Sequence, residues 1–590
     1  MKQFFKFMFA SMLGFFLVMV LVFFLMIAMI AGFASMASKD TVDIDKQSVL
    51  HLKLNTQIVD RSSQNPFESF DFMSFSPGRG VGLNDLLNNI KKAKADDKIE
   101  GIFLDLSMIT AGWSTIQEIR LALEDFRESG KFVISYGESY TQNAYYLASV
   151  ADEVYLHPEG LIDFRGINAE LVFLKNMLDR LGIDPQVIRH GEYKSAGEPL
   201  FRTNMSPENR EQILSYISSI WNNVASDVAE SRGLTLNHIN EVANGLQTRN
   251  AALALEWDMI DGYVYHDEMM DLLRERIGLD EDDKISFVGH GKYLKAPRPK
   301  GMPVVRSRDR IAVVYATGNI ISGEGSDRVI GSDRIAKAIR QAREDEHVKA
   351  IVFRINSPGG SALASDVILR EVKLAREEKP FVVTMGDVAA SGGYYIACAA
   401  DYIYASPNTI TGSIGVFGMV PNMKAFFNDK LGVTFDNVKT NRFADIGSVS
   451  RPLTRAERQI IQESIGQIYD TFTEHVAEGR NLPVSVVDEL GRGRVWTGAE
   501  ARQNGLVDDF GGLREAIAKA SELADIEEYR ITEYPIRKDF LTQFLEGFGG
   551  IRERVIQKEL GDAYKYYRQM QEVQEMQGIL MRLPYDIIIE

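Results

Sequence analysis

The chain contains an internal repeat, and this repeat constrains the fold more than any other feature of the sequence. Residues 102–158 align with residues 351–407 without a gap, at a constant offset (407 − 158 = 249). The matched pieces include Ile102-Phe103-Leu104 on Ile351-Val352-Phe353, Tyr145-Tyr146 on Tyr394-Tyr395, Asp152 on Asp401 and Pro158 on Pro407. Each half alternates short apolar strand patterns with helical patterns, which is typical of an α/β unit. The sequence therefore predicts an α/β fold of tandem duplicated domains.

The repeat and the composition around it divide the chain into five expected parts. They are a cytoplasmic stub with a transmembrane anchor (1–38), an N-terminal α/β domain (46–291), a basic, Pro-rich linker (292–309), a C-terminal α/β domain (310–535) and a helical tail (536–590). The helical pattern of the tail is clearest from Ile556 to Met576, where charges are interleaved with Tyr and Met. Such a tail could pack on the body or on a neighbouring subunit.

The N-terminus carries an uncharged, strongly apolar run from Phe7 to Ser38, preceded by Lys2 and Lys6. A cleavable signal peptide has an apolar core of about 7–15 residues, whereas a membrane span needs about 20. We therefore expect an uncleaved anchor, with cleavage among the small residues near its end as the weaker alternative. Lysines before the span place the N-terminus in the cytoplasm and the body outside it.

Charge and cysteine content exclude several classes of function. The formal net charge is −16 and the pI is about 5.2, so the chain lacks the basic footprint of a nucleic-acid-binding protein. Cys398 is the single cysteine, which excludes an intramolecular disulfide framework and a thiolate metal cluster. The spacings of zinc proteases and of nucleotide-binding P-loops do not occur, so we expect no metal and no cofactor.

Two loops in the second half suit a nucleophilic site. Ser391-Gly392-Gly393 follows a buried strand pattern that begins at Phe381, at a strand-to-helix turn where free backbone N–H groups can hold a developing anion. The loop from Asn356 to Gly360 follows another such strand and ends in paired glycines, which allow a close approach to substrate. Each loop alone is explained by an N-cap or a turn. Together, at the ends of neighbouring parallel strands, they favour a nucleophile with an oxyanion hole.

The first half lacks both loops and carries a lysine instead. Gln142-Asn143-Ala144 stands opposite the Ser391 loop, and Ile109-Thr110-Ala111 stands opposite the glycine loop. After a one-residue slip, Lys194 of the first half falls opposite Ala444 of the second. A lysine in a dry site has a lowered pKa and can act as a general base. Taken alone, Lys194 is best explained as a solvated surface residue, but complementary loss in the two halves favours a serine and a lysine that work together.

These motifs resemble those of the signal peptide peptidase A (protease IV) family in its long, double-domain form. The resemblance covers the chain from the anchor to about Leu523, and it rests on Asn356–Gly360, Gly386–Tyr395, Thr411–Gly415 and Tyr193-Lys194-Ser195. It implies a Clp-protease/crotonase-like fold and a serine endopeptidase with a Ser/Lys dyad. The roles that it implies are Ser391 as nucleophile, Lys194 as general base, Ser413 as the residue that orients the lysine, and Gly392 with Gly360 or Gly359 as oxyanion hole.

The same resemblance implies the setting in which the protein works. Its substrates would be cleaved signal peptides and similar short or unfolded peptides. The chain would be a single-pass protein of the bacterial inner (cytoplasmic) membrane, with its catalytic body on the periplasmic side. It would assemble into a ring-like homo-oligomer, which we expect to be a homotetramer.

Two other functions stay open from sequence alone. One is a non-catalytic membrane-bound scaffold. The other is a crotonase-type acyl-CoA enzyme, which would use acidic residues where this chain has Ser391 and Lys194. His190 is a rival base, although no acidic residue is placed to orient it, and His347 and His475 have no motif context, which disfavours a Ser-His-Asp triad.

Overall fold

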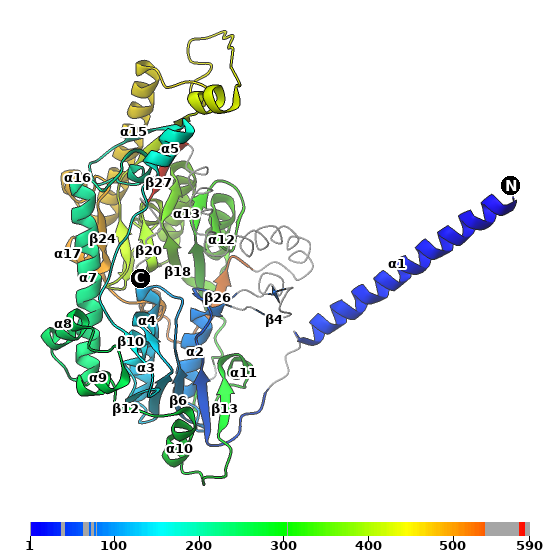
Figure 1. The fold of residues 1–590 in the computed structure, drawn as a ribbon, viewed down its shortest axis with the longest axis vertical. Helices are drawn as coiled ribbons and strands as arrows, with labels where there is room; N and C mark the ends of the chain where they lie inside the picture. The colour runs from blue at the N-terminus through cyan, green and yellow to red at the C-terminus, as the bar shows by residue number, and fades with distance from the viewer. Residues whose placement is uncertain are drawn as a thin grey trace.

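The structure is a computed structural model and describes residues 2–36, 42–62, 70–71, 76–77, 80–303, 305–536 and 578–583. The body is elongated, and helix α1 (Lys2–Met36) extends away from it (Figure 1). The stretch Gln3–Phe24 is long and apolar enough to cross a membrane, judged by length and composition, and none of it is buried in the body. The prediction of one N-terminal apolar helix is confirmed.

The first half forms a six-stranded sheet in the order β12-β9-β7-β6-β1-β13, and every pairing in it is parallel. Its strands are β1 (Ser48–Leu52), β6 (Ile99–Asp105), β7 (Phe132–Gly137), β9 (Glu153–Leu156), β12 (Gly262–Tyr263) and β13 (Ser286–Gly289). Its helices are α2 (Leu83–Lys94), α3 (Trp113–Arg127), α4 (Gln142–Ala148), α5 (Lys175–Leu181), α6 (Glu198–Phe201), α7 (Pro207–Arg232), α8 (Leu236–Gly245), α9 (Ala251–Glu256), α10 (His266–Ile277) and α11 (His290–Leu294). Successive residues of β6 alternate between two buried apolar clusters, Ile102 and Leu104 in one and Phe103 in the other, so the sheet is covered on both faces.

The second half forms an eight-stranded sheet in the order β24-β22-β20-β18-β14-β26, with β21 and β25 branching from β20. Its strands are β14 (Arg310–Thr317), β18 (Val348–Ser357), β20 (Phe381–Ala390), β21 (Tyr402–Ala405), β22 (Ile410–Gly412), β24 (Val495–Thr497), β25 (Asp509–Phe510) and β26 (Arg530–Tyr534). Its helices are α12 (Ser332–Glu344), α13 (Ala362–Glu378), α14 (Gly392–Tyr395), the π-helix η1 (Phe426–Lys430), α15 (Arg455–Arg480), α16 (Val484–Leu490), α17 (Gly498–Gln503) and α18 (Leu513–Leu523). At the repeat offset, β6, β7 and β9 correspond to β18, β20 and β21. The predicted tandem α/β fold is confirmed, whereas the exact domain limits stay a prediction.

A third sheet joins segments from three distant parts of the chain, in the order β11-β23-β27-β19-β15-β17-β16. Its strands are β11 (Asp184–Arg189) from the first half, β15 (Asn319–Ile321), β16 (Gly325–Ser326), β17 (Val329–Gly331), β19 (Gly359–Ser361) and β23 (Phe417–Asn422) from the second, and β27 (Gly578–Arg582) from the C-terminal region. Short two-stranded pairings complete the fold: β2 (Ile58–Val59) with β5 (Val81–Gly82), β3 (Phe70–Asp71) with β4 (Ser76–Pro77), and β8 (Tyr140–Thr141) with β10 (Ile162–Asp163).

Three segments differ from the sequence-based expectation. The helix expected after Ser391 is the four-residue α14, because the chain turns again after Tyr395. The expected linker begins inside α11, where Tyr293 is fully buried and Lys92 lies 4.4 Å over its ring. The sequence predicts a helical tail, but residues 578–582 of the tail form strand β27. This strand pairs with β19 on one side and with β23 on the other. The expected helix 556–576 lies outside the described residues.

The two halves cap each other's helices. Asp387 of the second half accepts hydrogen bonds from the Thr115 N–H (2.9 Å) and hydroxyl (2.7 Å) at the first turn of α3. Glu118 of the first half accepts from the N–H of Leu513, the first residue of α18, at 2.9 Å. Glycine occupies the N-cap position of both helices and supplies no side chain of its own. Because a carboxylate satisfies free N–H groups at a helix N-terminus, each half completes a helix of the other.

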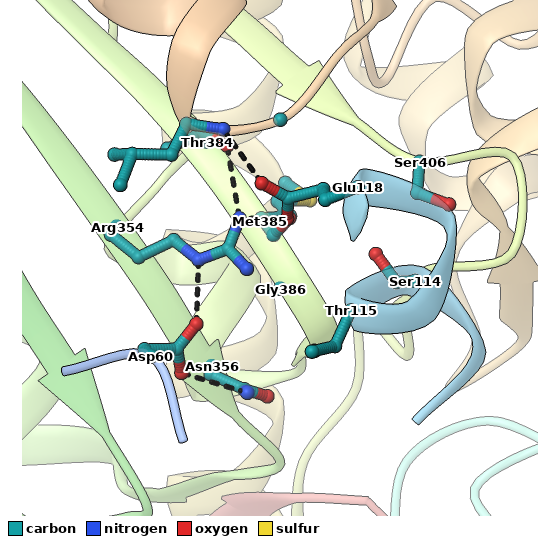
Figure 2. A network of polar contacts seen from close by, with 12 residues as sticks. Asp60, Ser114, Thr115, Glu118, Arg354, Asn356, Thr384, Met385, Gly386 and Ser406 are labelled. Carbon is teal, nitrogen blue, oxygen red and sulfur yellow. Dashed lines mark hydrogen bonds and ion pairs between the residues drawn. The ribbon is translucent and has the colours of Figure 1, made fainter. Parts of the chain in front are cut away.

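Arg354 on β18 lies between two carboxylates of the first half (Figure 2). Its Nε is 2.7 Å from Asp60 Oδ1, its Nη1 is 2.7 Å from Glu118 Oε1, and all three side chains are almost fully buried. Asp60 also accepts a hydrogen bond from the Asn356 amide at 2.9 Å. Burial disfavours the charge on Arg354, but the two carboxylates outweigh it and raise the pKa of the guanidinium above its usual range. The charges thus fix how the halves dock.

Arg354→Met is expected to destabilise the protein by about 3–5 kcal/mol, because Asp60 and Glu118 would stay buried without their cation. The measurement is the free energy of unfolding in urea of the detergent-solubilised protein. Arg376→Met is the matched control, since Arg376 and its partner Asp401 are 42% and 30% exposed, and it should cost about 0–1 kcal/mol. An equal loss in both variants would contradict a special role for the Arg354 network.

Candidate active site

Ser391 stands at the end of β20, immediately before α14. Its backbone has φ 56° and ψ −115°, a conformation that is rare for a residue with a side chain. Such strain costs on the order of 1–3 kcal/mol and is concentrated at functional sites. The Ser391 N–H donates to the Gly412 carbonyl at 2.8 Å, and the residue is fully buried. The surrounding sheet therefore holds this serine in a turn that the isolated chain would avoid.

The glycine loop lies beside Ser391 because β18 and β20 are parallel neighbours in the sheet. Gly359 has φ 99°, which favours glycine. A Cβ on Gly359 would lie 2.7 Å from the Gly392 nitrogen, so only a glycine allows the two backbones to come this close. Gly359 and Gly392, both expected in the oxyanion hole, are thus brought together. Gly360 follows in β19, opposite Ile320 of β15.

Strand β11 carries the lysine-bearing segment out of the first half and into the second. It pairs antiparallel with β23 along its whole length, from Asp184 opposite Asn422 to Arg189 opposite Phe417. The contact continues beyond the strand, where the Tyr193 N–H donates to the Arg492 carbonyl at 3.1 Å. Because these bonds are made by the backbone, they fix the position of the next residue, Lys194.

The side chains of Lys194, Ser391 and Ser413 meet in a fully buried site. The Nζ of Lys194 lies 2.8 Å from Ser391 Oγ, 2.9 Å from Ser413 Oγ and 3.1 Å from the Ser413 carbonyl oxygen. Burial lowers the pKa of Lys194 well below its usual range, because an ammonium group loses its hydration there. In its neutral form, the amine can take a proton from a hydroxyl at this distance. The arrangement is therefore chemically able to activate Ser391 as a nucleophile.

Two residues that the sequence analysis missed hold the Lys194 segment in place. Gly493 has φ 83°, and a Cβ there would lie 2.6 Å from Lys194 Cα, so the two backbones can cross only at a glycine. The Gln212 amide on α7 donates to the Tyr193 carbonyl at 3.1 Å and to the Ser195 hydroxyl at 3.0 Å. The Gly-Arg-Gly pattern that ends at Gly493 is a sequence signal for a tight backbone crossing. Gln212 sits in an ordinary helical pattern and has no such signal.

The rival base His190 has a different environment. Its ring stacks on Tyr469 with the ring centroids 3.9 Å apart, and its backbone N–H donates to the Val416 carbonyl. Within the described ranges, no group of three His, Cys, Asp or Glu side chains is placed to hold a metal ion. Ser391 Oγ thus lies at hydrogen-bond distance from the lysine amine, which also contacts the hydroxyl of Ser413.

Comparisons with known proteins identify a family model and relatives that match both halves of the chain. Residues 125–280 and 373–527 match the family model of Peptidase family S49. Protease 4 of Haemophilus influenzae is 36% identical over 516 residues, which are 85% of this chain and 83% of the relative. The chloroplastic serine protease SPPA of Arabidopsis thaliana is 34% identical over 514 residues, 86% of this chain and 74% of the relative. A solved ClpP1 mutant from Listeria monocytogenes is 17% identical, with 35% of this chain and 94% of that one covered and a TM-score of 0.24.

The family model matches once in each half, as the internal repeat requires, and the two matches together cover more than half of the chain. Both relatives align over most of the length of this chain as well as their own. The chain therefore belongs to peptidase family S49 and is a serine-type peptidase of that family.

Proposed function

We propose that the protein is a membrane-anchored serine endopeptidase in which Ser391 is the nucleophile and Lys194 is the general base. The observation that carries this proposal is the 2.8 Å contact between Lys194 Nζ and Ser391 Oγ, made between the two halves of one chain in a buried site. Ser413 orients the amine through its hydroxyl and its carbonyl oxygen. The absence of a carboxylate from these contacts matters, since a nearby anion would raise the pKa of Lys194 and weaken it as a base at neutral pH.

In the acylation step, neutral Lys194 takes the hydroxyl proton as Ser391 Oγ attacks the carbonyl carbon of the substrate. Negative charge develops on the carbonyl oxygen next to the N–H groups of Gly392 and of Gly360 or Gly359. Such a donor stabilises the transition state by about 3–4 kcal/mol in other serine proteases. The Lys194 ammonium then protonates the leaving amine, and the acyl group stays on Ser391.

In the deacylation step, water attacks the acyl ester while Lys194 again accepts a proton. Collapse of the tetrahedral intermediate releases the new carboxylate, and the proton returns from Lys194 to Ser391 Oγ. One water molecule is consumed for each peptide bond. The buried site limits the access of other water, which keeps Lys194 neutral between turnovers.

Helix α1 supports the proposed setting. Its apolar length fits a single membrane span, and Lys2 and Lys6 before the span favour a cytoplasmic N-terminus and a periplasmic body in a bacterial inner membrane. A peptidase held at that surface would meet cleaved signal peptides and other short or unfolded chains. The homotetramer stays a prediction from the family resemblance.

Ser391→Ala is expected to lower kcat for a fluorogenic peptide roughly 10⁴-fold or more, and Lys194→Met about 10²–10⁴-fold, because one removes the nucleophile and the other the base. Lys175→Met, which removes a partly exposed lysine of α5, should leave the rate unchanged. The assay uses the detergent-solubilised chain with circular dichroism as a check on folding. If the wild type hydrolyses the peptide no faster than both variants, the result would favour a non-catalytic membrane-bound scaffold over the proposed peptidase.

Ser413→Ala is expected to lower kcat about 10- to 100-fold with little change in KM, because the amine loses one of the groups that aim it at Ser391. Steady-state kinetics on the same peptide measures the two constants separately. A rise in KM at constant kcat would instead place Ser413 in substrate binding.

The pH dependence of kcat/KM follows from the lowered pKa of Lys194. Below that pKa the amine is protonated and has no lone pair for the serine proton, so activity is lost as pH falls and reaches its plateau well below pH 10.4, the ordinary lysine pKa. Lys194→Arg should be inactive across the whole range, because a guanidinium is not deprotonated in proteins. An ascending limb near pH 10 would contradict a buried lysine base.

A further inference from the structure

Lys194 occupies the centre of a tight three-residue turn. The Ser195 N–H donates to the Tyr193 carbonyl at 2.8 Å, which closes the turn around the lysine. The turn satisfies the Tyr193 carbonyl but provides no partner for the carbonyl of Lys194, and Lys194 is fully buried. A buried carbonyl needs a hydrogen-bond donor. Whichever group donates to it also fixes the direction in which the lysine side chain leaves the backbone.

The donor is the side chain of Arg189, the last residue of β11. Its Nη1 donates to the Lys194 carbonyl at 3.0 Å. The chain reverses between the two residues at Gly191, where φ is 91° and a Cβ would lie 2.3 Å from the Arg492 carbonyl oxygen. Because backbone bonds to β23 hold Arg189 within β11, its guanidinium connects the lysine turn to the sheet that joins the two halves.

Glu198 of α6 contacts the same guanidinium. Its Oε1 lies 3.6 Å from Arg189 Nη1, and the carboxylate is fully buried whereas the Arg189 side chain is 30% exposed. Glu198 Oε2 accepts from the Ser206 N–H and from the Asn209 amide, both at 3.1 Å. Oε1 has no hydrogen-bond partner among the residues that the structure describes. Such a buried carboxylate is costly unless a cation lies beside it, so Glu198 holds Arg189 in place.

The network continues to the other side of the turn. The Gln212 amide donates to the side-chain oxygen of Asn209 at 3.1 Å and to the Tyr193 carbonyl at 3.1 Å. Asn209 and Gln212 lie one turn apart on α7. The carbonyls of Tyr193 and Lys194 are therefore held by one connected set of polar side chains, and Arg189 is its member that contacts Lys194 directly.

We propose that Arg189, oriented by Glu198, is a positioning residue for the general base Lys194, an inference that rests on the proposed function. The guanidinium fixes the peptide plane that follows Lys194, so that Nζ stays 2.8 Å from Ser391 Oγ. A guanidinium suits this role because its planar fork has donors for a carbonyl oxygen and a carboxylate at once. It transfers no proton itself, since arginine stays protonated in proteins.

The alternative is an ion pair that serves the fold alone. Loss of such a pair would lower the fraction of folded protein and leave the folded molecules as active as before. Loss of a positioning residue slows the chemical step in folded molecules, because the amine is no longer aimed at the hydroxyl. The two roles are separated by kcat measured on folded protein and by the return of activity when a free guanidinium is supplied.

The test measures hydrolysis of a fluorogenic peptide by the detergent-solubilised full chain, with circular dichroism as the check on folding. Arg189→Ala is expected to lower kcat about 10- to 100-fold, with KM within about twofold of the wild type. Methylguanidinium at millimolar concentration should restore part of that kcat, because the partly exposed space beside Glu198 is open to a small cation. It should change neither the wild type nor Lys194→Met. Arg165→Ala, which removes a guanidinium that is 66% exposed, is the matched control and should keep the wild-type kcat.

A second variant separates positioning from folding. In the double variant of Arg189→Ala and Glu198→Gln the pair leaves no buried charge behind, so it should fold even where Arg189→Ala does not. Its kcat should be no lower than that of Arg189→Ala, because Glu198 acts through Arg189. Methylguanidinium should not restore it, since the carboxylate that would bind the cation is gone.

Wild-type kcat in folded Arg189→Ala, or in the double variant, would overturn the inference. A reduced kcat that methylguanidinium leaves unchanged in folded Arg189→Ala would overturn it too. In both cases the proposed function stands as long as Ser391→Ala and Lys194→Met are inactive beside an active wild type. A wild type that does not hydrolyse the peptide would overturn both the inference and the proposed function.

Discussion

A lysine amine kept away from water is the condition on which the rest of this structure depends. Exposed to solvent, Lys194 would have a pKa near 10.4 and would hold its proton at any physiological pH. Neither half can bury it alone, because the segment that carries it leaves the first half as β11 and joins the sheet of the second. The backbone pairing of β11 with β23 and the crossing at Gly493 close the site around it. The proposed base is thus a product of docking the two halves.

The proposed mechanism requires accurate docking, since an error of about 1 Å between base and nucleophile can cost a hundredfold in rate. Apolar contacts alone are poor at setting such a position, because they have no direction. The polar contacts between the halves do have direction: Asp387 reaches the first turn of α3, Glu118 reaches the first turn of α18, and Arg354 lies between Asp60 and Glu118. Asp387 lies only four residues before Ser391, so the same strand that positions the proposed nucleophile also positions the first half.

Local patterns account for what the sequence could predict. Strands β18 and β20 contain short apolar runs that recur in the first half, and their loops carry glycines, so the α/β fold and the serine and glycine loops could be predicted. Strand β11 was not, because it contains Pro185 and its partner β23 lies in the other half; it tolerates the proline as an edge strand. Strand β27 could not be predicted for a similar reason, since the short stretch Gly578–Arg582 becomes a strand only when partners from 359–361 and 417–419 enclose it. The helix expected after Ser391 is short because the chain turns again after Tyr395.

The repeat also explains why each chain has one candidate site and not two. At the first-half position equivalent to Ser391 stands Gln142, whose side-chain oxygen accepts the N–H groups of Arg165 and Gly166, both at 3.0 Å. The same side chain donates to the Gly166 carbonyl at 3.2 Å. These bonds satisfy backbone groups that would otherwise be left without partners in a partly buried turn. With a glutamine at that position, the first half has no counterpart of Ser391, and Lys194 instead contacts Ser391 of the second half through a segment that crosses between the halves.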